Sequence, residues 1–113
     1  MPEKSKKYIA QKIFMLLFLV QESMPELLQK NFLESGITYD TSSKEATKAD
    51  FKILAEAAVN KDDVNGNLGD GSQKKVFDTL GIISATIAEA SQEQIDKLNA
   101  LADIFNINPK QIL

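Results

Sequence analysis

Residues 13–20 read Ile13-Phe14-Met15-Leu16-Leu17-Phe18-Leu19-Val20, eight apolar side chains in a row. They follow a lysine-bearing segment, residues 4–12, and precede the polar residues Gln21 and Glu22. A helix over this run is apolar on every side for two turns, so it must be covered all round by other helices or by a partner chain. We therefore expect it to be the central helix of a bundle.

A domain of this size has limited apolar surface with which to wrap one helix completely. The run therefore supports two predictions, which the sequence leaves open. In the first, all of it is internal core. In the second, Phe14, Leu17 and Phe18, or the opposite face of the helix, also pack across a symmetric dimer. We take Phe14, Leu17 and Phe18 as the candidate interaction surface.

Lysines before a short apolar run are also typical of a secretory signal. However, no small-x-small cleavage site follows Val20. Eight apolar residues also fall short of the roughly 20 needed to cross the hydrocarbon of a bilayer. We expect a cytoplasmic chain with no membrane span, in which residues 1–7 form a flexible lead-in and residues 8–113 form a single all-α domain.

Three segments carry the signature of a helix start, a serine followed three residues later by Glu or Gln. They are Ser23 to Glu26, Ser42 to Glu45, and Ser91 to Gln94. In such a capping box the two side chains satisfy backbone N–H groups of the first turn. Gly36 and Asn106 suit the left-handed residue at which helices end. These signals divide the chain into successive helices.

Apolar residues recur at helical spacing between the signals, and Ser72 opens a further helical segment. The stripes include Leu28 and Phe32; Leu54 and Ala58; Val76, Phe77, Leu80, Ile83 and Ile87; and Leu98, Leu101 and Phe105. Asn108-Pro109 predicts a last short turn. Nowhere do apolar and polar residues alternate convincingly over five positions, as a half-buried strand requires. The sequence predicts an all-α fold, a compact bundle of four to five helices.

The composition lacks the side chains that carry most catalysis. The 113 residues include 13 cations, all lysine, and no Arg, His, Cys or Trp, and the net charge is -3. Imidazole acid–base chemistry, thiolate nucleophiles and zinc or iron–sulfur ligation are therefore excluded. No glycine-rich phosphate loop is present. We expect a non-enzymatic protein without a cofactor, and the exclusive use of lysine hints at an AT-rich bacterial or phage genome.

One loop has the oxygen-rich composition of a calcium site. Its candidate ligands are Asp62, Asp63, Asn65, Asn67 and Asp70. An EF-hand loop that begins at Asp63 requires glycine at its sixth position and glutamate at its twelfth. The chain has Leu68 and Lys74 there, so the EF-hand template fails. A turn-rich connector accounts for the same composition, and calcium binding is the third functional alternative.

Residues 72–113 resemble the helix-turn-helix of the Cro and lambda-repressor type. The resemblance is carried by Ser72-Gln73, Val76-Phe77, Leu80-Gly81-Ile82, Thr86-Ile87 and the segment 98–109. It implies a turn at Gly81 and a second helix that reads the major groove. The DNA-binding candidates that it implies are Gln73, Lys74, Lys75, Ser84 and Ala85.

The charges of this segment do not favour DNA. Residues 82–90 contain no lysine or arginine, and residues 72–113 carry four positive and five negative side chains. Cations on phosphates supply most of the affinity of DNA-binding proteins. We therefore expect a small helical protein that binds another protein, including a second copy of itself. A helix-turn-helix regulator, or a relative that lost DNA contact, is the alternative.

Overall fold

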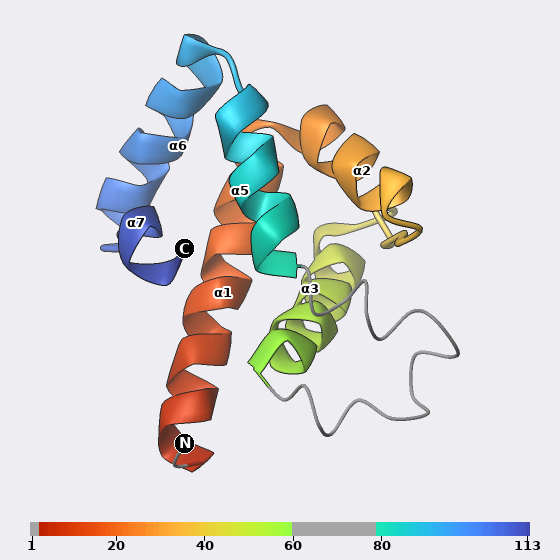
Figure 1. The fold of residues 1–113 in the computed structure, drawn as a ribbon, viewed down its shortest axis with the longest axis vertical. Coiled ribbons are helices and arrows are strands. Elements are labelled where there is room, and N and C mark those ends of the chain that lie inside the picture. Colours follow the sequence, from red (N-terminus) through yellow and green to blue (C-terminus); the bar gives the residue numbers. More distant parts are fainter. Residues whose placement is uncertain (1–2, 60–78) are drawn as a thin grey trace.

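A computed structural model of the chain describes residues 3–59 and 79–113 (Figure 1). Within these ranges the fold consists of helices and turns, without a strand. The helices are α1 (Glu3–Ser23), α2 (Pro25–Glu34), α3 (Lys44–Val59), α5 (Thr79–Glu89), α6 (Gln92–Ile104) and α7 (Pro109–Ile112). The predicted all-α bundle is confirmed, and the predicted last short turn is α7.

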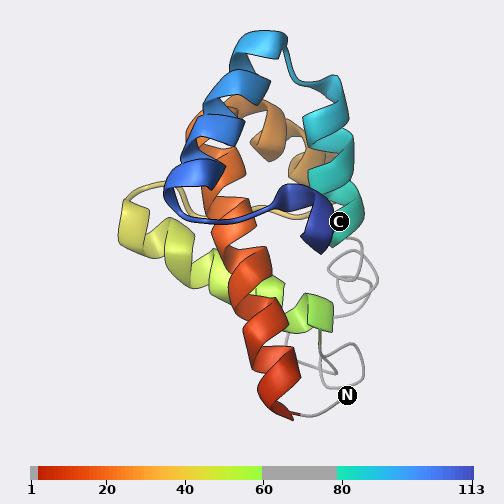
Figure 2. The same cartoon turned by 90° about the vertical axis from the view of Figure 1, so that its left-hand side faces the viewer.

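Helix α1 is the central element, and the other helices pack around it (Figures 1 and 2). Within the apolar run, Ile13, Leu16, Leu17, Leu19 and Val20 are at most 1% exposed. The structure places residues 3–7 in α1 as well, whereas the sequence analysis sets them apart as a flexible lead-in. The run is thus wrapped mainly by helices of its own chain.

The break between α1 and α2 lies at Met24, which is fully buried. Pro25 disfavours helical geometry at the residue before it, and Met24 has φ -150° and ψ 61°. The predicted capping box at Ser23 is wrong, because Ser23 belongs to α1. Its hydroxyl donates to the carbonyl oxygen of Leu19 at 2.8 Å.

Helices α2 and α6 end in the same motif, as Gly36 and Asn106 predict. Gly36 has φ 79° and Asn106 has φ 55°, both in the left-handed region. The N–H of the following residue, Ile37 or Ile107, donates back to the carbonyl oxygen of Phe32 or Ala102 at 2.9 Å. This pairing satisfies carbonyls that a helix end leaves open. It also turns the two isoleucines into the core.

Two of the predicted helix starts have side-chain caps. At α6, Ser91 accepts from the N–H of Gln94 and the Gln94 side chain accepts from the N–H of Ser91, so this capping box is confirmed. At α3 the cap is Ser43, whose hydroxyl accepts from the N–H of Ala46. The capping box predicted from Ser42 to Glu45 is therefore wrong, because the cap lies one residue later and Ala46 has no side-chain acceptor to complete a box.

An aromatic cluster closes the packed side of the bundle. The Tyr39 ring lies 5.6 Å from that of Phe32 in α2 and 4.9 Å from that of Phe51 in α3. Its hydroxyl donates to Oε1 of Gln21 in α1 at 2.6 Å. Burial raises the pKa of Tyr39 well above its ordinary value. One residue of the α2–α3 connection thus joins three helices.

Candidate functional site

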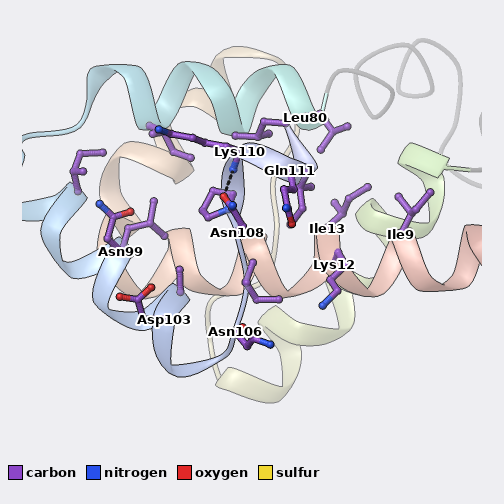
Figure 3. Close-up of a pocket in the computed structure, with 18 of the residues that line it drawn as sticks. Ile9, Lys12, Ile13, Leu80, Asn99, Asp103, Asn106, Asn108, Lys110 and Gln111 are labelled. Carbon is purple, nitrogen blue, oxygen red and sulfur yellow. Dashed lines mark hydrogen bonds between the residues drawn. The ribbon is translucent and has the colours of Figure 1, made fainter.

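The candidate site is a groove between α5 and α6, which diverge from the short loop that joins them (Figure 1). We call it the α5–α6 groove. Its volume is about 1590 Å³. Helix α1 forms its floor, and α7 with the preceding segment borders it. Figure 3 shows Ile9 and Ile13 on α1, Leu80 on α5, and Asn99 and Asp103 on α6 around this space.

The lining of the α5–α6 groove is apolar in its depth. The apolar side chains from its three long helices are Ile9, Ile13, Leu80, Ile87, Ile95 and Leu98. Ile13 and Leu98 are buried, whereas Ile9, Leu80, Ile87 and Ile95 are only half-buried. Tyr8, which also lines the groove, is 61% exposed. The bundle therefore leaves part of its apolar surface uncovered here.

Polar groups form the rim of the same groove. They are Lys12, Asn99, Asp103, Asn106, Asn108, Lys110 and Gln111. Asn108 caps α7, because its side-chain oxygen accepts from the N–H of Lys110 at 3.0 Å (Figure 3). Asp103 is the only side-chain carboxylate among the lining residues that the structure describes. The rim can donate and accept hydrogen bonds, but it offers no pair of acidic groups for acid–base catalysis.

Buried polar contacts fix helix α5, one wall of this groove, against α2. The Asn31 amide donates to Oγ1 of Thr86 at 2.9 Å and to Oε1 of Glu89 at 3.1 Å. The Thr86 hydroxyl donates in turn to the carbonyl oxygen of Ile82 at 2.7 Å. Asn31 and Thr86 are both buried. Because buried polar groups are costly to leave unpaired, this network sets the position of α5.

The three residues of the predicted interaction surface do not share one environment. Leu17 is fully buried, so its assignment to a surface is wrong. Phe14 and Phe18 are half-buried on α1, and Phe14 lines a second groove between α1 and α3. The ammonium group of Lys48 lies 5.1 Å from the centre of the Phe18 ring. Of these three residues, only the two phenylalanines remain candidates for contact with a partner.

The residues implied by the helix-turn-helix resemblance have mixed outcomes. Gly81 lies inside α5, within an unbroken helix, so the turn expected at this glycine is absent. Ser84 and Ala85 are exposed on α5. Three further DNA candidates, Gln73, Lys74 and Lys75, lie outside the described residues, as do Ser72, Val76 and Phe77.

The calcium candidates Asp62, Asp63, Asn65, Asn67 and Asp70 also lie outside the described residues. Among residues 3–59 and 79–113, no group of three or more acidic side chains could hold a metal ion. In the same ranges, no helix has the length and apolar character needed to cross a membrane.

The sequence does not predict the α5–α6 groove, although four of its apolar lining residues, Ile13, Leu80, Ile87 and Leu98, are predicted to face inward. Ile87 and Leu98 look like ordinary inward-facing positions of two amphipathic helices. The angle between these helices is not encoded in their periodicity. The exposed Tyr8 and Leu113, next to Ile9 and Ile112, are the local signal that could have indicated an uncovered apolar surface.

Comparisons with known proteins identify no relative of this chain. No protein-family profile, no curated protein and no solved structure matches it.

Proposed function

We propose that the protein is a binding module without chemistry of its own, and that its α5–α6 groove receives the apolar face of a partner protein's helix. One observation carries this proposal, namely apolar surface of α1, α5 and α6 that remains uncovered along the groove. Uncovered apolar surface rimmed by polar groups is typical of protein interaction sites.

The dimensions of the groove favour a protein segment over a small molecule. Small-molecule pockets enclose about 300–1000 Å³ and bury most of the ligand. The α5–α6 groove, at about 1590 Å³, is larger and lies open at the surface. Two diverging helices with a third beneath them form the kind of cradle into which an amphipathic helix inserts its apolar side chains. A helix from a second copy of the chain is one such partner.

The alternative functions receive less support. Helix α5 contains no lysine, so the exposed face with Ser84 and Ala85 offers no cation to a DNA phosphate. A salt-dependent gel shift with duplex DNA would nevertheless favour the regulator. Calcium binding is tested by thermal melting with calcium and with a chelator, because a ligand that binds only the folded state raises the melting temperature.

The experiment that tests the proposal is site-specific photo-crosslinking. A benzophenone amino acid replaces Tyr8 in the groove or, as the matched control, Leu33 on α2. The two side chains are equally exposed, at 61% and 62%. In cells that make the protein naturally, we expect the benzophenone at position 8 to give a discrete protein adduct and the one at position 33 to give none. Mass spectrometry then identifies the adduct as another protein or as a second copy of the chain.

Replacement of Ile95 by lysine provides the second arm, because it places a charge in the groove wall. We expect this variant to remain folded, since Ile95 is only half-buried, and to lose the Tyr8 adduct. Equal labelling from Tyr8 and Leu33, or an adduct that persists in the Ile95→Lys protein, would contradict the proposal.

A further inference from the structure

A second groove lies on the opposite face of the same half of α1, between α1 and α3. We call it the α1–α3 groove. Ala10, Gln11 and Phe14 line it from α1, and Ala49 and Ala55 line it from α3. Its volume is about 690 Å³. The two grooves share no lining residue, so they are separate surfaces.

The charge of the α1–α3 groove is opposite to that of the chain. Lys6, Lys7, Lys48 and Lys52 line it together with two carboxylates, Glu45 and Glu56. Among the described residues that line it, four positive and two negative side chains give a local charge of +2, whereas the whole chain carries -3. An anionic segment of a partner is therefore attracted to this groove, whereas the net negative charge of the chain repels it elsewhere.

Within the described part of the chain, none of these lysines forms a close ion pair. The ion pairs there join other lysines, Lys30 to Glu34 at 3.9 Å and Lys44 to Glu22 at 3.6 Å. Lys48 and Lys52 are both exposed. Their exposed ammonium groups can reach the carboxylates of a partner, which is the arrangement that electrostatic complementarity requires.

The floor between the lysines is apolar and close to the backbone. Ala10 and Ala55 are buried, and their small side chains let another chain approach closely. Phe14 is half-buried and presents part of its ring. Aromatic side chains in such positions supply much of the contact energy of interfaces. The groove therefore combines an apolar contact with flanking cations.

We propose that the α1–α3 groove binds an acidic amphipathic helix of another protein. The apolar face of that helix packs on Phe14 between the alanines, and its carboxylates pair with Lys6, Lys48 and Lys52. A flat bilayer surface does not enter a concave groove. A long nucleic acid meets the negative charge of the remaining surface. This site is independent of the α5–α6 groove, so either proposal can fail alone.

The test uses a fluorescein-labelled helical peptide with leucines along one face and glutamates on the other. A peptide of the same pattern with lysines in place of the glutamates is the control. Fluorescence anisotropy measures binding at low and at high salt. We expect the acidic peptide to bind, more weakly as salt rises, and the lysine peptide not to bind. Failure of the acidic peptide to bind at low salt would overturn the proposal.

Two double variants with the same change of net charge locate the site. Lys48→Glu with Lys52→Glu alters the groove, and Lys30→Glu with Lys97→Glu alters α2 and α6. We expect the first to weaken peptide binding about tenfold or more, and the second to change it by less than about twofold. Circular dichroism checks folding, and Lys48→Gln with Lys52→Gln replaces the first pair if charge reversal unfolds it.

Other occupants of the groove are distinguished by parallel measurements. Phosphatidylserine vesicles and single-stranded oligothymidylate are titrated against the same two double variants, and sedimentation measures self-association. Tighter, Lys48- and Lys52-dependent binding of vesicles or oligonucleotide than of the acidic peptide would overturn the proposal. Self-association that only the groove variant abolishes would also overturn it, because the occupant would then be a second copy.

Discussion

The two halves of α1 differ in composition and in surroundings, because the four lysines of this helix all lie within residues 4–12, whereas the apolar run occupies residues 13–20. In the C-terminal half, Leu16, Leu17, Leu19 and Val20 have no exposed surface. In the N-terminal half, residues 6–14 lie between two grooves, one on each face. In both views the N-terminal end of α1 projects beyond α2, α5, α6 and α7 (Figures 1 and 2).

In our proposals, one helix therefore serves both as core and as recognition element. Tyr39 holds the closed half, because its hydroxyl donates to Gln21 of α1. The buried amide of Asn31 joins α2 to α5. The open half carries the lysines and the half-buried side chains Ile9 and Phe14. A rigid closed half fixes the open half in place, which lowers the entropic cost of binding a partner there.

The largest expected effect comes from removing a side chain of the closed half. Leu17→Ala should lower the free energy of unfolding by about 3 kcal/mol, because it leaves a cavity in the core. Ile9→Ala, in the open half, should lower it by less than about 1 kcal/mol, since the side chain is already partly hydrated. Urea denaturation followed by circular dichroism measures both. Similar losses for the two variants would remove the distinction between the halves.

A smaller effect is expected at the contact that anchors α5, one wall of the α5–α6 groove, to α2. Thr86→Val keeps the shape of the side chain but deprives the Asn31 amide of its partner at 2.9 Å. The free energy of unfolding should fall by about 1–2 kcal/mol. Ser84→Ala on the exposed face of α5 is the control and should change it little. An unchanged stability for Thr86→Val would show that the network does not hold α5.

The cap of α6 is expected to contribute about 1 kcal/mol. Ser91→Ala removes the acceptor for the N–H of Gln94, and loss of such a cap costs about that much. Because α6 forms the other wall of the α5–α6 groove, hydrogen exchange should accelerate in its first turn and not in α2. Uniform acceleration over the whole chain would argue against a locally stabilised α6.

The smallest effect at neutral pH concerns Tyr39, which joins α1, α2 and α3. Burial raises the pKa of this phenol in the folded state, so the unfolded state loses its proton first as the pH rises. The neutral phenol contributes its full stabilisation below about pH 10, which is the pKa of tyrosine in the unfolded state. This contribution is lost as the pH rises further. Tyr39→Phe should therefore flatten the fall in melting temperature above pH 10. An identical alkaline decline in both proteins would contradict this.

The sequence predicts the helices well because their signals are local. The left-handed residues Gly36 and Asn106, the cap at Ser91 and the short turn at Asn108-Pro109 each depend on a few neighbouring residues. It fails at Ser23, where the effect of Pro25 on Met24 overrides a capping signal. It also fails at Gly81, where the helix-turn-helix resemblance implies a turn but the residue lies within α5.

The candidate sites are less predictable, because they depend on how helices lean against one another. Phe14 and Leu17 are equivalent in the apolar run, yet one lines a groove and the other is internal. Lys6 and Lys52 are far apart in sequence and share a groove only because α3 packs along α1. Helical periodicity gives the face of each residue, but not the angle or distance to the next helix.

Thiol labelling along α1 tests the central claim most directly, since the natural chain has no cysteine. Single variants Tyr8→Cys, Phe14→Cys and Leu17→Cys are exposed to a maleimide under native conditions, and the modified fraction is followed by mass spectrometry. We predict rapid labelling at positions 8 and 14. At position 17 labelling requires unfolding and should be more than about a hundredfold slower. Rapid labelling at 17, or protection at 8 and 14 in the free monomer, would contradict the account.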